Sequence, residues 1–320
     1  MEPKKIIKFG NSSYVITLPH SWLEKNSLSK GDFLQTIEKD NSLIFYINKD
    51  NKSECVATIN VDKKPLKLLN KELLSYYLKN YKTIELEGEK ILEILDDIRR
   101  LKEKVSSLEI TEIQKNKVIL QDLTSQKDIN INKLIEDIIK MEYLFFDELI
   151  HEIDYNKYQF LLELDTNINK LSFLAHKSIN YHLNTWENPD IVKDSISYWR
   201  IIGAFETSGD ILKRIAQYLK NNENSNKPEI SDLITKLKEY YIFITNFILD
   251  NRELNKNLEI YLDKKQTILR EIENSKEKFS ENINLFLVLS QLFKDIIGKL
   301  DTIVISIIDI NTKENQSLTE

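Results

Sequence analysis

KIIKFGNSSYVITLP, residues 5–19, contains two short apolar runs separated by a Gly-Asn-Ser turn. In the second run Tyr14, Ile16 and Leu18 stand at every second position, which is the side-chain period of a β-strand. Pro19 follows directly, and proline suits a helix start because its φ is preset and its missing N–H needs no partner there. The segment therefore predicts a β-hairpin that leads into a short helix.

Further turn signals follow this hairpin. The tripeptide at residues 30–32, Lys-Gly-Asp, is expected to turn the chain again. Residues 33–37 and 42–47 are predicted to be two strands joined across Asp40 and Asn41. Four strands of about five residues each are too short to close a hydrophobic core alone. The first fifty residues are therefore expected to dimerise.

Residues 1–48 resemble the SpoVT/AbrB domain, the swapped-hairpin family that includes the MazE antitoxins. The turn glycines, the proline and the strand phase in residues 8–12, 16–19 and 30–32 carry the resemblance. It implies that two copies of the chain exchange hairpins to form a β-barrel, and that the paired face binds DNA. The alternative is that this module only holds two copies together.

The side chains expected to contact DNA are those that can reach phosphate oxygens, which position a protein without reading base sequence. They are Lys4, Lys5, Lys8, Asn11, Ser12, Thr17 and His20. Residues 1–50 contain seven lysines against six acidic residues, and the first arginine is Arg99. Arginine is the usual side chain for reading guanine and clamping phosphate, so its absence weakens the DNA interpretation.

The composition of the whole chain favours long helices in a cytoplasmic protein. The 320 residues include only six glycines and five prolines, too few for a loop-rich or β-sandwich protein. A single cysteine, Cys55, excludes an internal disulfide and fits a reducing compartment. The sequence contains no apolar run of the length or position that would predict export or a membrane span. The net charge of −6 argues against a protein that coats nucleic acid without sequence specificity.

After a polar linker at residues 49–54, residues 55–125 predict a small α/β connector module. Strand-like alternation and helical periodicity succeed one another in a β-α-β-α-β-β order. The expected elements are a strand at 55–61, a helix from Pro65, a strand at 82–87, a helix at 91–105, and strands at 108–113 and 118–123. No phosphate-binding loop or metal motif occurs in this module.

From residue 126 to 311 the pattern is almost continuously helical, which predicts an antiparallel helix bundle. The expected helices lie near residues 130–153, 155–184, 190–221, 228–250, 252–275 and 277–311. One apolar seam runs from Tyr198 to Leu219, with the small Ser208 at one of its steps. The fold class is therefore multidomain α+β: a hairpin barrel, an α/β connector and an all-α bundle.

The bundle resembles the PhoU proteins, all-helical regulators of phosphate uptake built from two three-helix repeats. Residues 164–169, the Asn188-Pro189 loop and residues 205–215 carry the resemblance. The whole chain resembles archaeal PhoU-related regulators that place an AbrB-like module before such a bundle. The resemblance implies a partner, either the ATPase of a phosphate transporter or a sensor kinase.

The PhoU resemblance also implies a cluster of acidic residues, spaced four apart, that holds an iron or other divalent metal. Glu206 and Asp210 match this pattern, and Asp165 matches with Asn169 as its partner. Spacing of four places each pair on one helix face, where the oxygen atoms could share a cation. The equivalent pair in the second repeat is degraded, so one metal site at most is expected. The alternative is that these carboxylates form ordinary solvated helix faces.

The sequence thus predicts a cytoplasmic, dimeric, DNA-binding transcriptional regulator of phosphate uptake. One alternative is an adaptor that never binds DNA and acts on the transporter or kinase, with the hairpins as a dimer clasp. No nucleophile elbow, HExxH or CxxC motif is present, so we do not expect an enzyme. A more remote alternative is nevertheless a bundle enzyme with a catalytic di-metal centre.

Overall fold

The computed structural model describes residues 3–39, 41–47, 56–62, 64–186, 188–222, 228–249, 257–279 and 282–316. The chain divides into two compact units, Met1–Ser53 and Glu54–Glu320, which are described separately. The expected linker at residues 49–54, together with Cys55 and Asp40, lies outside the described residues.

The first unit contains two separate hairpins. Strand β1 (Ile7–Phe9) pairs antiparallel with β2 (Ser13–Val15), and β3 (Gln35–Lys39) pairs antiparallel with β4 (Ser42–Tyr46). Helix α1 (His20–Lys25) follows Pro19 as the sequence predicts. Strand β2 ends earlier than expected, since Ile16 and Leu18 lie beyond it.

Two glycines allow the turns of this unit. Gly10 and Gly31 have φ angles of 71° and 102°, a region that side chains other than glycine rarely adopt. Beside Gly31, the Asp32 carboxylate accepts hydrogen bonds from the Ser29 backbone N–H (2.6 Å) and hydroxyl (3.2 Å). The described strands of this unit form two two-stranded sheets and no closed barrel.

The second unit begins with a four-stranded sheet of order β5-β6-β8-β7. Its elements have the predicted order. They are β5 (Val56–Asn60), α2 (Leu66–Leu78), β6 (Thr83–Glu87), α3 (Leu95–Lys102), β7 (Leu108–Ile113) and β8 (Lys117–Asp122). β5 and β6 are parallel and are joined through α2, whereas β6–β8 and β8–β7 are antiparallel.

The core of this sheet module lies under α2 and α3. Leu69, Leu73 and Tyr77 of α2 pack with the buried residues of the sheet and of α3. α3 begins at Leu95, later than the sequence predicts, because residues 89–94 form turns. A hydrogen bond from the Lys90 backbone N–H to the Asp62 carboxylate (3.1 Å) holds these turns against the end of β5.

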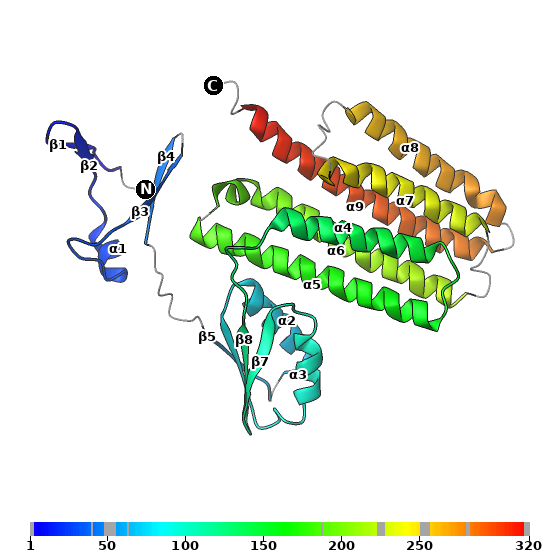
Figure 1. Ribbon diagram of the computed structural model, residues 1–320, viewed down its shortest axis with the longest axis horizontal. Coiled ribbons are helices and arrows are strands. Elements are labelled where there is room, and N and C mark those ends of the chain that lie inside the picture. Colours follow the sequence, from blue (N-terminus) through cyan, green and yellow to red (C-terminus); the bar gives the residue numbers. More distant parts are fainter. Residues whose placement is uncertain are drawn as a thin grey trace. The chain divides into compact units, whose positions relative to one another are not determined.

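The rest of the second unit is a helix bundle with its own large hydrophobic core (Figure 1). Its helices are α4 (Ile131–Leu149), α5 (Tyr155–Thr185), α6 (Pro189–Lys220), α7 (Pro228–Leu249), α8 (Leu258–Asn274) and α9 (Ile283–Gln316), with the 3-10 helix η2 (Ser275–Phe279) before α9. The six expected helices are therefore present, although α8 begins later and α9 ends later than predicted.

In chain order the six helices form two halves of three, and α6 and α9, from different halves, pack together more extensively than any pair within the second half. α4, α5 and α6 pack together, as do α7, α8 and α9, and the halves meet through α6 with α9 and α4 with α7. Side-chain caps hold several helix starts; for example, Asp154 accepts from the Lys157 N–H and Asn188 accepts from the N–H groups of Asp190 and Ile191. Among the described residues, no helix has the length and apolar character needed to cross a membrane.

Candidate functional site

The seven residues expected to contact DNA all lie on the surface of the hairpin unit. Lys8 is on β1 opposite Tyr14, and His20 begins α1, where its Nδ1 lies 3.4 Å from the Glu24 carboxylate. Lys4 and Lys5 precede β1, Asn11 and Ser12 form its turn, and Thr17 follows β2. Five of the seven, residues 4, 5, 8, 11 and 12, thus lie in β1, in the segment just before it and in the turn after it.

The hairpin unit has no core of its own. None of the residues 3–38 and 41–47 is buried, and Phe33 is 92% exposed. On β1 and β2, Ile7 and Val15 are paired across the hairpin and share a face with Phe9, because side chains alternate along a strand. All three are exposed. Within the described residues, this apolar face of the hairpin is therefore uncovered.

In the bundle, Lys213 lies between two of the four residues that the sequence assigns to a metal. Its Nζ is 2.9 Å from both Asp165 oxygens and 2.5 Å from Asp210 Oδ1. Burial lowers the pKa of Lys213, but the bonds to Asp210 and Asp165 outweigh this and raise it overall. This arrangement is an ionic cross-link from α5 to α6.

The other two residues of the predicted metal site lie beside this link. Burial raises the pKa of Glu206, and the negative charges of Asp210 and Asp165 raise it further. Asn169 Oδ1 is buried without a hydrogen-bond partner among the described residues. No three His, Cys, Asp or Glu side chains in the described part of the chain gather to form a metal-binding group. Two of the four predicted ligands, Asp165 and Asp210, are instead hydrogen-bonded to the Lys213 ammonium.

The second half of the bundle contains a similar link. Asp301 of α9 accepts a hydrogen bond from the Tyr261 hydroxyl (2.5 Å) and pairs with the Lys265 ammonium, both from α8. Each half therefore joins its second and third helices through a lysine and a carboxylate. The sequence pattern showed the acidic residues of both halves, but it did not indicate which lysines would face them.

Sequence reasoning missed Glu142, the most unusual carboxyl group in the bundle. It is 0% exposed and occupies an apolar-face position of α4 between Ile139 and Phe145. A Cβ on Gly209 of α6 would lie 3.7 Å from Glu142 Oε1, so the two helices approach closely there. The sequence did contain a signal for this burial, because Glu142 continues a run of isoleucines spaced three and four residues apart, which is the spacing of a buried helix face.

The surroundings of Glu142 are polar but poorly bonded. Neither carboxyl oxygen has a well-formed hydrogen bond within the described residues, nor does the Ser208 or the Tyr241 hydroxyl. Burial raises the pKa of Glu142 to about 8, against the weaker opposing effects of Tyr241, Ser208 and the Gly209 backbone. This pKa favours the protonated form of the Glu142 carboxyl at neutral pH.

A second missed feature is a buried ion pair between the sheet module and the bundle. Lys177 of α5 lies 2.5 Å from Asp122 at the end of β8, and both side chains are almost inaccessible to solvent. Lys177 Nζ also lies 3.8 Å from the centre of the Tyr77 ring. Burial lowers the pKa of Lys177 to about 8 although the bond to Asp122 opposes this. Nearby, Asn180 Nδ2 donates to the Leu78 carbonyl (2.9 Å).

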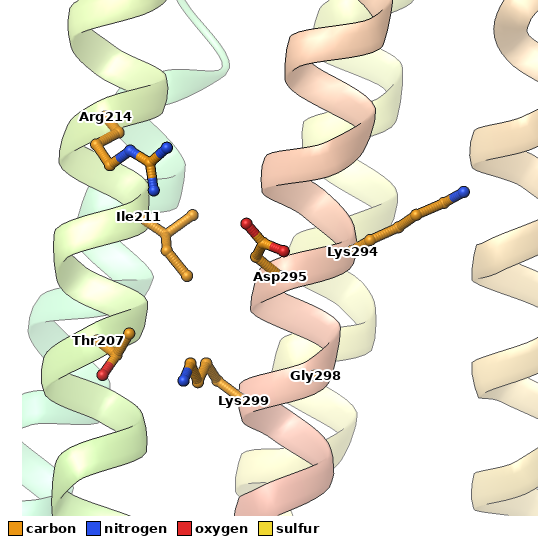
Figure 2. Close-up of a pocket in the computed structure, with 7 residues that line it drawn as sticks. All are labelled: Thr207, Ile211, Arg214, Lys294, Asp295, Gly298 and Lys299. Atoms are coloured by element: carbon orange, nitrogen blue, oxygen red, sulfur yellow. The ribbon is translucent and has the colours of Figure 1, made fainter.

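An open groove lies between α6 and α9 (Figure 2), with a volume of about 470 Å³. Arg214, Asp295 and Lys299 point into the space between the two helices, whereas Lys294 points away; Lys294 pairs instead with Glu273 (3.3 Å). Because both charge signs line the groove, its chemistry does not single out one class of ligand.

Comparison of the chain with protein-family models, with curated proteins and with solved structures gives no match.

Proposed function

We propose that the chain is a DNA-binding regulator of phosphate uptake that acts as a dimer. In this proposal residues 1–48 of two copies exchange hairpins into a SpoVT/AbrB-like barrel that contacts DNA. Residues 126–311 form a PhoU-like bundle that responds to a protein partner, either a phosphate-transporter ATPase or a sensor kinase. The single observation that carries the proposal is the uncovered apolar face of the hairpins.

The physical argument for the dimer is one of burial. Fully burying an aliphatic or aromatic side chain contributes about 1.5–3 kcal/mol, and the hairpin unit leaves Ile7, Phe9, Val15 and Phe33 exposed. Because short hairpins are marginal in water, the folded unit needs this burial. A second copy supplies a matching surface by symmetry, as in most homodimers.

The DNA part of the proposal depends on exposed lysines in and next to the same hairpin. Lys8 alternates with Ile7 and Phe9, so it points away from the apolar face. Lys5 and Lys8 form no ion pair with the described residues, and both are exposed. They are therefore free to replace the counterions of a phosphate backbone.

The helix arrangement supports the regulatory part of the proposal. Two sets of three helices, which contact each other through α6 with α9 and α4 with α7, are compatible with a bundle of two three-helix repeats. An adaptor that does not bind DNA is the second candidate. The near balance of lysines and acidic residues in residues 1–50 favours it, because that unit carries little net positive charge.

Two substitutions on adjacent residues separate pairing from DNA binding. Ile7→Asp places a charge in the apolar face, so light scattering should report a loss of the dimer mass and DNA binding should fall with it. Lys8→Ala, on the opposite face, should keep the dimer mass and weaken DNA binding alone. A wild-type chain that remains monomeric at micromolar concentration would refute the proposal.

A further inference from the structure

Helix α5 belongs to two hydrophobic cores at once. Ile168, Ala175 and Ile179 are buried in the core of the bundle. Phe173 packs instead against the core of the sheet module, and Lys177, one turn further on, is 0% exposed. Because residues four apart share a face of a helix, Phe173 and Lys177 form a stripe that is distinct from the one in the bundle core. The sheet module therefore covers one face of α5.

A buried ion pair forms part of this contact. The Lys177 ammonium pairs with the Asp122 carboxylate at the end of β8 (2.5 Å), and the two side chains are 0% and 1% exposed. The same ammonium lies 3.8 Å from the centre of the Tyr77 ring on α2. The Tyr77 hydroxyl in turn accepts a hydrogen bond from the Ser107 hydroxyl (3.2 Å). Two elements of the sheet module thus converge on one side chain of α5.

Two asparagines link the backbones of α2 and α5. Asn180 of α5 donates from its side chain to the carbonyl of Leu78, the last residue of α2 (2.9 Å). Because the last carbonyls of a helix have no partner within it, this bond also caps α2. In return Asn80, whose φ of 65° is left-handed, donates from its side chain to the Lys177 carbonyl (3.2 Å). Hydrogen bonds have narrow geometric limits, so both would break if α2 slid along α5.

These contacts are better suited to fixing an orientation than to adding stability. A buried ion pair contributes little net free energy because desolvation offsets the attraction, but separating its members leaves a buried charge without its partner. If the two parts moved apart, Asp122 would keep Lys82 at 3.5 Å, whereas Lys177 has no second carboxylate among the described residues. Other arrangements of the sheet module on α5 are therefore penalised, although parts of one chain usually move relative to each other.

We propose that the sheet module and the bundle move as one rigid body, with Lys177 and Asp122 as the positioning residues that fix their orientation. The sheet module is then an extension of α5 and not a flexible connector. A displacement of α5 is consequently passed through α2 and β8 to the whole sheet, including β5 at its edge. This inference concerns the second unit alone and holds whether or not the chain binds DNA.

The test measures the distance between the two parts of the full chain by double electron–electron resonance. Cys55→Ser removes the only cysteine of the chain. Nitroxide labels are then attached to Lys115→Cys, in the turn between β7 and β8, and to Gln217→Cys, on α6. Both positions are exposed, so the labels should not disturb either core.

The central variant combines Lys177→Met with Asp122→Asn. It removes both charges together, so neither is left buried without a partner, and circular dichroism with denaturant unfolding checks that it folds. Lys177→Met alone is the second variant. Lys265→Met is the matched control, because it breaks a lysine–carboxylate pair that joins α8 to α9 within the bundle.

The wild-type background and Lys265→Met should each give a single narrow distance distribution. The double variant should keep its fold but give a distribution at least about twice as wide, because motion between parts of a chain is the default once nothing fixes their orientation. Lys177→Met alone should broaden the distribution as well. A wild-type distribution with several peaks would overturn the inference. So would folded variants at Lys177 with a distribution as narrow as that of the wild type, or equal broadening in Lys265→Met.

Discussion

Replacing Glu142 by glutamine should stabilise the bundle at alkaline pH. Glu142 is 0% exposed, and its pKa is about 8 in the folded protein against an ordinary value of 4.5. Between these two pH values the folded state keeps a proton that the unfolded state has released. The unfolding free energy of the wild type should therefore fall as the pH rises from 4.5 to 8 and level off above 8.

The size of this effect follows from the difference between the two pKa values. That difference is 8 − 4.5 = 3.5 pH units, and at 1.36 kcal/mol per unit it corresponds to about 5 kcal/mol. Glutamine has nearly the same shape and cannot ionise. The advantage of Glu142→Gln over the wild type should therefore be smallest near pH 5 and should grow by up to about 5 kcal/mol by about pH 8.5.

The assay is denaturant unfolding of both proteins from about pH 5 to pH 9, followed by far-ultraviolet circular dichroism. Glu152→Gln is a suitable control, because Glu152 is exposed at the end of the α4–α5 connection. Taking the difference between variant and wild type removes contributions that other titrating groups make to both. A difference between Glu142→Gln and wild type that stays constant across this pH range would refute the argument.

Two further substitutions test the packing of the second unit. Lys177→Met removes the buried cation beside Asp122 and leaves that carboxylate only the partly exposed Lys82 at 3.5 Å, so the unfolding free energy should fall by up to about 3 kcal/mol, and Lys177→Met with Asp122→Asn should recover part of it. A single variant as stable as the wild type in denaturant titration would contradict a buried pair. Gly88→Ala would place Cβ 2.5 Å from Asp62 Oδ1 and 2.7 Å from Val61 Cγ2, which should cost about 1–3 kcal/mol. An unchanged melting temperature would mean that this turn is looser than the structure indicates.

Sequence periodicity predicted the order of the elements well because most segments have a clear apolar stripe. The β-α-β-α-β-β order of the sheet module and the six bundle helices are confirmed. Element ends were less accurate for local reasons. α3 begins at Leu95 because Asp62, distant in sequence, anchors the turn before it at Lys90. Such an anchor depends on tertiary contacts and leaves no periodic signal.

The polar contacts inside the bundle were harder to predict than the number and order of its helices. Spacing of four places Glu206 and Asp210 on one helix face, but it does not reveal what lies opposite. Lys213 meets Asp165 only because α5 and α6 pack together, with the two residues 48 positions apart in sequence. Lys177 and Asp122 are 55 residues apart and likewise meet only through the packing of α5 against the sheet module.

The measurement that tests the proposed function most directly is binding of the full chain to DNA by fluorescence anisotropy. The duplexes come from upstream of the chain's own gene and of phosphate-transport genes, with a scrambled duplex as the control. The account predicts tighter binding to one of these duplexes than to the scrambled one, with affinity falling steeply as salt rises. Replacing Lys5 and Lys8 by alanine should reduce the salt slope of the dimer by about four, because two lysines from each copy each neutralise one phosphate. Binding no tighter than to the scrambled duplex at low salt would contradict the account and favour an adaptor whose hairpins only hold two copies together.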